Sequence, residues 1–348
     1  MNQNIFSTPI VLFLYKRLDT VVQIIDRIRS IKPSKLYILS DGPKNDEETL
    51  IVDNIRNSVE RLIDWECEVI KKYSPINIGV YENIGEGAKW VLSHEKEAIF
   101  IEDDNLPEIS FFFFCKELLN KYSDEEKVLW ICGTNYLEDK FKPIDSSSYL
   151  FSQHLMPCGW ASWSHKFIKY YDGKIETVLN KESLRLIRKN YKNKSLFRYQ
   201  LRNVVDERKD QLRGKRIKSW DHQLALSIRL HNLYGIVPCV NLIKNIGVDD
   251  VSEHGGTTFN NIMTQRFCGI ETQQLKFPLK HPNVVEKNDI YEKKVDNIIL
   301  PPCTLRVKKD IIFATKYILK VIIGEKMLNR ILVFKRKLFT KNKVNKKN

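Results

Sequence analysis

Short apolar runs alternate with amphipathic stretches along the first part of this chain. Four of the runs have strand length and contain no charged residue, a pattern typical of strands buried on both faces of a sheet. They cover residues 9–15, 36–39, 98–101 and 128–132. Between them, as in residues 21–31, apolar side chains recur at every third or fourth position, which indicates amphipathic helices. We therefore predict an α/β fold in which helices flank a mostly parallel sheet.

Weaker patterns predict further elements. Residues 47–63 and 87–94 are expected to be helical, and residues 67–70 and 238–246 to form strands. Residues 176–218 combine helical periodicity with many charges, which we interpret as solvated helix faces. An amphipathic helix is expected to begin near Asp221, a residue type that often caps helices. We divide the chain into a domain of residues 1–300, with halves 1–148 and 149–300, and a tail of residues 301–348.

Three consecutive acids follow the apolar run 98–101. Parallel strands end at the edge where open α/β sheets place their ligands, so Glu102, Asp103 and Asp104 are expected in a binding crevice. Their carboxylates repel one another unless a cation compensates them. Hard oxygen ligands of this kind suit Mg²⁺ or Mn²⁺ carrying a substrate diphosphate. The alternative interpretation is a helix N-terminus capped by Asn105, with Pro107 in the first turn.

The positive charge of the chain is concentrated near its C-terminus. The net charge is +14, and residues 301–348 contain fourteen Lys or Arg against two acids, which leaves 43 basic and 41 acidic residues elsewhere. A near-neutral body argues against a nucleic-acid enzyme, which usually carries a basic stripe. We interpret residues 305–348 as a basic amphipathic helical tail that lies on an anionic membrane surface. The alternative is a packing helix followed by a solvated tail.

The cysteines and the N-terminus indicate a cytoplasmic protein. Seven cysteines are scattered without metal-binding spacing, which fits a reducing compartment better than a disulfide framework. The N-terminus lacks the pattern of a signal peptide, and no apolar stretch is long enough to span a bilayer. With the basic tail, these features predict peripheral association with the inner face of the cell membrane.

An aromatic corner follows residue 149, where Gly159, Trp160 and Trp163 lie close together in the sequence. Large aromatic side chains next to small residues are typical of a packed core. The same residues could instead form a platform for a sugar ring, with an aromatic face exposed beside the glycine. Both interpretations are compatible with the sequence.

Five signatures occur in an order that resembles a known family. They are the acidic strand, its PEISFFFF continuation, the CGWASW corner, the SWDHQ segment and PCVNLIKNIG. Together they resemble bacterial glycosyltransferases that are often described as sugar-nucleotide transferases or hemolysin-like proteins. More distantly, they are similar to the catalytic domain of animal glycoprotein N-acetylglucosaminyltransferase I. The resemblance covers about residues 8–260 and implies a Rossmann-like GT-A fold that binds a nucleotide-sugar in residues 1–148 and an acceptor in residues 149–300.

The resemblance also implies roles in binding the donor. Arg17 matches a basic residue that contacts the donor phosphates, and Asp41 matches an acid that binds the nucleotide base. Trp220 matches a wall of the sugar site, and His254 lies in the loop that closes over the donor. We add Asn77 as a donor-binding residue because of its position in the third loop.

The catalytic and metal-binding roles fall on acids. By the same resemblance, Glu102 and Asp103 contact the donor sugar and ribose, and Asp104 binds Mn²⁺ or Mg²⁺ directly. Asp221 matches the catalytic base of an inverting transfer, in which a carboxylate accepts the proton of the attacking hydroxyl. The expected acceptor is a hydroxyl of a polysaccharide or of a lipid-linked glycan, and the expected donor is a UDP-sugar.

Two other functions compete with this hypothesis. A sugar nucleotidylyltransferase would have a similar fold, but it usually has a glycine-rich loop after the first strand, and residues 9–19 contain no glycine. A non-catalytic protein that binds membranes or nucleic acid through the basic tail would leave the acidic triplet and residues 219–223 unexplained. We expect no nucleic-acid partner.

Overall fold

The structure is a computed structural model, and it describes residues 6–171, 173–248, 258–305 and 307. The chain divides into two compact units, Met1–Ile299 and Leu300–Asn348. The predicted membrane-surface tail lies outside the described residues except for residues 305 and 307. Among the described helices, none is both long enough and apolar enough to cross a bilayer.

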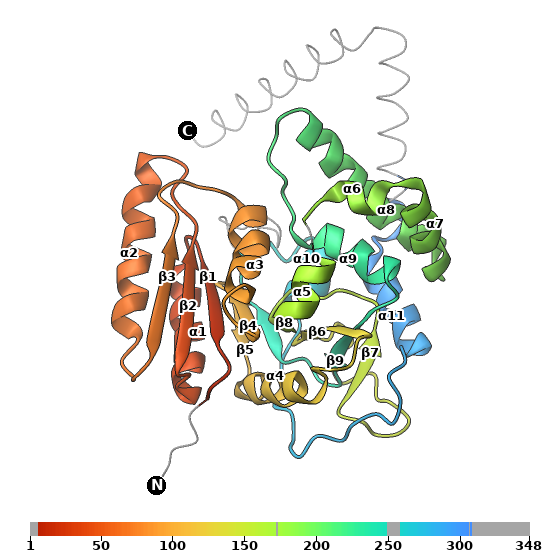
Figure 1. The fold of residues 1–348 in the computed structure, drawn as a ribbon, viewed down its shortest axis with the longest axis horizontal. Helices are drawn as coiled ribbons and strands as arrows, with labels where there is room; N and C mark the ends of the chain where they lie inside the picture. Colours follow the sequence, from red (N-terminus) through yellow and green to blue (C-terminus); the bar gives the residue numbers. More distant parts are fainter. Residues whose placement is uncertain (1–5, 172, 249–257, 306, 308–348) are drawn as a thin grey trace, which may run out of the picture. The chain divides into compact units, whose positions relative to one another are not determined.

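Eight strands of the described residues form one sheet, in the order β3-β2-β1-β4-β8-β6-β9-β7 (Figure 1). Their bounds are β1 Ile10–Leu14, β2 Lys35–Ser40, β3 Glu68–Tyr73, β4 Glu97–Glu102, β6 Val128–Cys132, β7 Tyr149–Ser152, β8 Trp160–Trp163 and β9 Tyr234–Pro238. β8 runs antiparallel to β4 and β6, and β7 runs antiparallel to β9, whereas the other neighbours are parallel. This architecture confirms the predicted α/β fold, a mostly parallel sheet flanked by helices.

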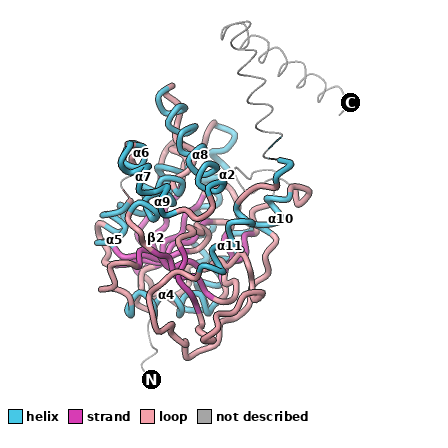
Figure 2. Tube along the Cα trace, turned by 90° about the vertical axis from the view of Figure 1, so that its right-hand side faces the viewer, coloured by secondary structure: helices cyan, strands magenta, loops and turns pink. Residues whose placement is uncertain are grey.

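Helices cover both faces of the sheet (Figures 1 and 2). Their bounds are α1 Leu18–Ile31, α2 Asp46–Leu62, α3 Gly87–Leu92, α4 Ile109–Lys121, α5 Ser164–Tyr170, α6 Ile175–Leu179, α7 Lys181–Asn190, α8 Lys194–Leu212, α9 Asp221–Leu230, α10 Ile262–Cys268 and α11 Asp289–Ile299. A π-helical turn, Tyr81–Glu86, leads directly into α3. The predicted 176–218 segment is thus three helices followed by a loop.

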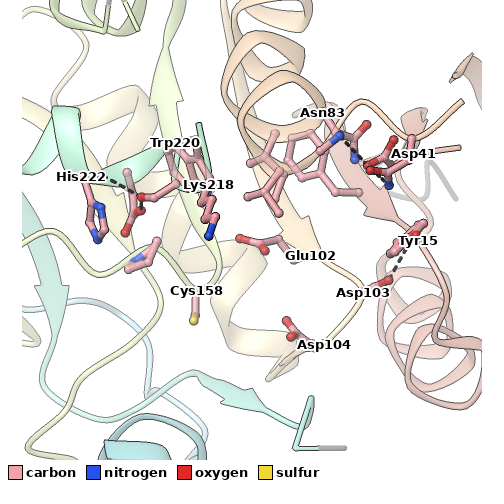
Figure 3. Close-up of a pocket in the computed structure, with 18 of the residues that line it drawn as sticks. Tyr15, Asp41, Asn83, Glu102, Asp103, Asp104, Cys158, Lys218, Trp220 and His222 are labelled. Carbon is pink, nitrogen blue, oxygen red and sulfur yellow. Dashed lines mark hydrogen bonds between the residues drawn. The ribbon is translucent and has the colours of Figure 1, made fainter. Parts of the chain in front are cut away.

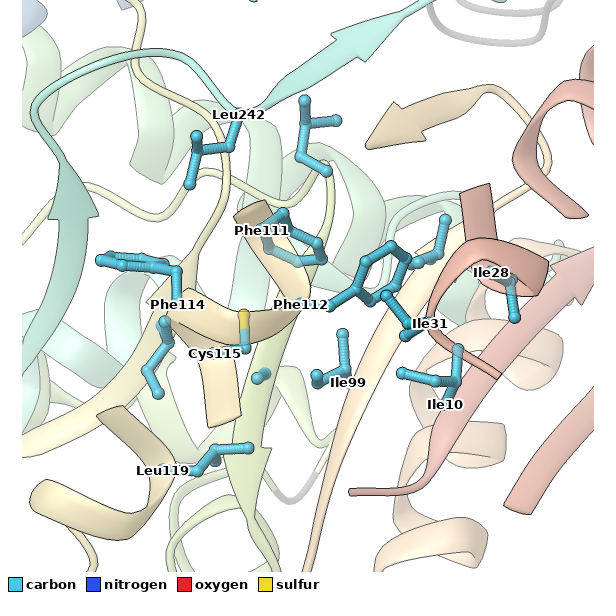
Figure 4. Close-up of a cluster of buried hydrophobic side chains, with 14 of the residues drawn as sticks. Ile10, Ile28, Ile31, Ile99, Phe111, Phe112, Phe114, Cys115, Leu119 and Leu242 are labelled. Carbon is cyan, nitrogen blue, oxygen red and sulfur yellow. The ribbon is translucent and has the colours of Figure 1, made fainter. Parts of the chain in front are cut away.

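The core lies on both sides of the sheet, which explains why the strand sequences lack polar breaks. In β1, Ile10 and Leu12 point into a core with α1, α2 and α4, while Val11 and Phe13 point into a second core with α3, α5, α9 and α11. Phe111, Phe112 and Phe114 of α4 fill the first of these cores (Figure 4). Burial of β1 on both faces therefore selects apolar residues at every position.

The segment after the acidic triplet does not form the helix N-terminus capped by Asn105 that the sequence allowed as an alternative. Asn105 does not cap a helix, because Asn105–Pro107 forms the short strand β5, which pairs antiparallel with β10, Ile243–Asn245. Helix α4 begins at Ile109, and Glu108 occupies the N-cap position. The helix-cap interpretation is therefore wrong, and β5 and β10 form a small second sheet beside the acids.

The predicted strand 238–246 is also corrected. β9 ends at Pro238, and β10 begins only at Ile243. Asn241 interrupts the apolar run, and its side chain forms two hydrogen bonds with the backbone. Its amide group donates to the backbone carbonyl of Ile243, and its Oδ1 accepts from the backbone N–H of Asn135. These two bonds turn the chain out of the main sheet and toward β5.

Candidate functional site

A cleft of about 620 Å³ opens at the carboxyl ends of the parallel strands β1, β2 and β4 (Figure 3). One wall comes from residues at or just after the ends of these strands, including Tyr15, Asp41 and Glu102. The other wall comes from α8 and from residues 218–222 at the start of α9. β1 lies between β2 and β4, and the chain order reverses at this point, so the cleft occupies the position where open α/β sheets bind ligands.

The three acids lie together at the end of β4, beside Arg17. The Asp103 carboxylate accepts a hydrogen bond from the backbone N–H of Tyr15 at 2.9 Å and one from Arg17 at 3.1 Å. The same guanidinium nitrogen lies 3.3 Å from Oδ2 of Asp104. Strand pairing sets this arrangement, because β1 and β4 are adjacent and Phe13 is the register partner of Glu102.

The carboxylates are poorly compensated. Burial raises the pKa of Glu102 well above its ordinary range, and the charges of Asp104, Asp103 and Asp221 raise it further. Burial and the charge of Asp104 raise the pKa of Asp103 to about 6, although Arg17 acts in the opposite direction. The charge of one arginine does not balance three acids, so a bound cation would stabilise this end of the cleft.

The donor set fits a divalent ion that is shared with a substrate. The described residues contain no group of three or more His, Cys, Asp or Glu side chains placed to hold a metal by themselves. Mg²⁺ and similar ions are commonly held by one or two carboxylates together with substrate phosphates. Asp104 has the required partly open position, since its side chain is 17% exposed and lines the cleft.

Gly247 leaves room for the side chain of Asp104. No sequence pattern had singled out this glycine. A Cβ at Gly247 would lie 2.4 Å from Oδ2 of Asp104, so a larger residue would displace the carboxylate. The backbone carbonyl of Asp104 also accepts a hydrogen bond from Ile246 at 2.8 Å. The segment after β10 therefore packs directly against the candidate metal ligand.

Asp41 lines the cleft, but its carboxylate already has partners in the protein. It accepts hydrogen bonds from the backbone N–H groups of Gly42, Ile78 and Gly79 at 2.7 to 2.9 Å, and from the Asn77 side chain at 2.9 Å. Both oxygens thus hold the loop that follows β3. Asp41 and Asn77, both predicted to bind the donor, thus contact each other, and their side chains shape the cleft wall.

Asp221 lies on the opposite wall, as the first residue of α9. The Ser219 hydroxyl donates a hydrogen bond to its carboxylate and accepts one from the backbone N–H of His222. The Asp221 carboxylate thus lies at the end of α9 that carries the partial positive charge of the helix dipole. Trp220, only 3% exposed, stacks on Trp160 with ring centroids 5.5 Å apart and supports this corner of the cleft.

His222 and α8 extend this wall beyond the predicted residues. Burial lowers the pKa of His222, but a 3.0 Å hydrogen bond with Glu207 and the charge of Asp221 outweigh burial and raise it above the ordinary value. Asp206 and Asp210 of α8 also line the cleft. The predicted solvated faces are confirmed here, since the Asp206 side chain is 61% exposed, and this side of α8 in addition forms part of the cleft wall.

The aromatic corner belongs to the core. Trp160 and Trp163 are each 1% exposed, and neither lines the cleft. Trp160 is stacked between Phe100 and Trp130, with ring centroids at 3.9 and 4.2 Å. Gly159 adopts φ +62 and lies against the side chain of Ile243. The structure thus places none of the three predicted platform residues in the lining of the cleft, while His254 lies outside the described residues.

No protein-family model matches the chain, and no curated protein matches it. Among solved structures, the mannosyltransferase PcManGT from Pyrobaculum calidifontis, in complex with GDP-Man and Mn²⁺, is 9% identical over 64% of this chain and 69% of that one, with a TM-score of 0.34. UDP-glucose pyrophosphorylase complexed with UDP-glucose is 10% identical over 69% of this chain and 94% of that one, with a TM-score of 0.35.

HddC from Yersinia pseudotuberculosis is 12% identical, with a TM-score of 0.25. That match covers 35% of this chain, and the chain spans 57% of the length of HddC. Likenesses of this size carry no information about activity.

Proposed function

We propose that this protein is a metal-dependent glycosyltransferase that moves a sugar from a nucleotide-diphosphate donor to a hydroxyl group of a glycan or glycolipid, with inversion at the anomeric carbon. One observation carries the proposal. The acidic end of β4, with Arg17, faces the carboxylate of Asp221, the first residue of α9, across one cleft at the switch point of the sheet. These are the two groups that such a transfer needs on opposite sides of the reacting bond.

The two walls of the cleft would have different roles in the reaction, metal binding on one side and proton transfer on the other. Asp104 would hold Mn²⁺ or Mg²⁺, and a divalent cation supplies positive charge that stabilises a departing diphosphate. Asp221 accepts the proton of the acceptor hydroxyl while its oxygen attacks the anomeric carbon and the bond to the diphosphate oxygen breaks. A single displacement of this kind inverts the configuration. The donor half would be residues 1–148, and the acceptor half residues 149–300.

One contact favours this function over a nucleotidylyltransferase. Nucleotidyl transfer usually relies on free backbone N–H groups in a loop after the first strand, where phosphates bind. Here the first such group, the backbone N–H of Tyr15, donates to Asp103. The resemblance found in the sequence further supports a uridine nucleotide as the donor base.

The donor class is tested by thermal denaturation of the full chain with UDP, GDP and dTDP, each with and without Mn²⁺. We expect one diphosphate to raise the melting temperature, and to do so much more strongly in the presence of the metal. At a ligand concentration a hundred times Kd, the stabilisation is about 2.7 kcal/mol. Failure of all three nucleotides to shift the melting temperature under either condition would refute the proposal.

We also propose that the protein works in the cytoplasm at an anionic membrane, where lipid-linked acceptors occur. The seven cysteines form no disulfide, which supports a reducing compartment. Full-length protein is expected to float with phosphatidylglycerol vesicles and not with phosphatidylcholine vesicles, because each basic residue near an anionic surface adds about 1 kcal/mol. A version that ends at Pro301 is expected to lose flotation, and equal flotation of both versions would contradict a role of the tail.

A further inference from the structure

Residues 213–220 connect α8 to α9 and run along the cleft; we call this segment the strap. Lys218, Ser219 and Trp220 of the strap line the cleft directly. The strap belongs to the same wall as Asp221, which follows it in the sequence. The path of the strap therefore determines which side chains of this wall point into the cleft.

Arg216 ties the strap to the opposite wall. Its guanidinium donates to the backbone carbonyl of Asn77 at 2.6 Å and approaches Oδ1 of the same residue at 3.3 Å. Asn77 is itself held by Asp41, through a hydrogen bond of 2.9 Å. A chain of contacts thus runs from the end of β2, through the loop after β3, to the strap. This chain fixes the strap across the cleft.

Lys218 differs from the other cations of the cleft. Arg17 is engaged by Asp103 and Asp104, and the His222 ring is engaged by Glu207. For Lys218, the described residues provide neither a hydrogen bond nor an ion pair within contact distance, and its charge acts at longer range on Asp210, whose pKa it helps to lower. Figure 3 shows Lys218 between Trp220 and Glu102, directed into the space between the walls.

We propose that Lys218 binds the diphosphate of the nucleotide-sugar donor, and that Arg216 is a positioning residue that holds the strap for this contact. The inference rests on the proposed function and deepens it. A diphosphate that enters this cleft meets the repulsion of several carboxylates, and the one arginine near β4 is already shared between two of them. A lysine ammonium is a compact charge on a flexible stem, suited to a phosphate group that arrives with the substrate.

Binding measurements with matched variants test the role of Lys218. Affinities are measured by titration calorimetry, with Mn²⁺, for UDP, GDP and dTDP and for the nucleoside of whichever binds. Lys218→Met is expected to weaken binding of the diphosphate about tenfold to a hundredfold, the range for a lost hydrogen bond to a charged group, and to leave nucleoside binding unchanged. Lys218→Arg should restore most of the affinity.

Lys215→Met is the control. Lys215 also lies on the strap and is exposed, but it pairs with Asp210 at 2.9 Å and does not line the cleft. Equal affinities of the Lys218→Met and Lys215→Met variants for the diphosphate would overturn the inference while leaving the proposed function intact. Absence of binding by the unaltered protein would overturn both. Circular dichroism and the melting temperature establish that each variant is folded.

The positioning role of Arg216 has its own readout. Arg216→Gln is expected to weaken binding of the diphosphate about threefold to tenfold in the unaltered background, less than loss of the lysine itself. If Arg216 acts through Lys218, the same substitution should have no further effect in the Lys218→Met background. Additive effects of the two substitutions would show that Arg216 does not act through the lysine.

Discussion

Replacement of Asp221 by Asn is expected to lower the rate of sugar transfer by about 10²- to 10⁴-fold, the usual contribution of a general base. The amide has the size of the carboxylate and can still accept the hydrogen bond from Ser219, so α9 should keep its N-terminal geometry. What the variant loses is the capacity to take up the proton of the acceptor hydroxyl. Donor affinity is expected to remain within a few-fold of the original, because the substitution leaves Arg17, Asp104 and Lys218, the groups proposed to act on the donor phosphates, unchanged.

The measurement is kcat for transfer, together with the donor Kd by calorimetry. Asp289→Asn provides a matched control, since Asp289 is also the first residue of a helix, α11, and does not line the cleft. That variant loses the same interaction with a helix N-terminus but should keep full activity. Undiminished transfer by Asp221→Asn would exclude Asp221 as the base and remove the main argument for inversion.

Replacement of Asp104 by Asn is expected to abolish the effect of Mn²⁺ on both nucleotide binding and transfer. Stabilisation of the leaving diphosphate by a metal amounts to several kcal/mol, so activity should fall about a hundredfold to a thousandfold. An Asn oxygen is neutral and binds Mn²⁺ much more weakly than a carboxylate does. The loss of one acid also relieves the repulsion that raises the pKa of Glu102 and Asp103, so the fold should be retained.

A second variant tests whether the position of the Asp104 carboxylate matters as well as its presence. Gly247→Ala keeps Asp104 but places a Cβ 2.4 Å from its Oδ2. We expect the Mn²⁺ affinity to fall in the same direction as in Asp104→Asn, and by less, because the side chain can shift at a cost. If Asp104→Asn instead shows the original dependence on Mn²⁺ in a metal titration, the metal is bound elsewhere.

Much of the fold could be predicted because the signals are local. In β1, apolar residues at every position predicted a strand buried on both sides, and the two cores confirm it. The spacing of apolar residues in α1 and the opening of α9 at Asp221 were read correctly as well, although Trp220 and not Asp221 occupies the N-cap position. Periodicity failed where side-chain hydrogen bonds interrupt a run, as Asn241 does between β9 and β10.

The site was predictable only in part. The acidic triplet at the end of β4 follows from strand order, since such strands end at the binding edge. By contrast, the acids on α8 were interpreted as solvated, because a helix sequence does not reveal which polar face meets a cleft. Trp160 and Trp163 show the reverse case: their residue types suit a sugar platform, and the insertion of β8 between β4 and β6 buries them.

The sequence by itself determined the strands, the helix that begins at Asp221 and the cluster of acids after β4. Each of these depends on neighbours within a few residues, through periodicity, capping or like charge. The tertiary structure decided which distant residues meet: Asp41 with the loop at Gly79, Gly247 with Asp104, and Arg216 with Asn77. Such contacts depend on the order of strands in the sheet and on the paths of the loops, which no local pattern encodes.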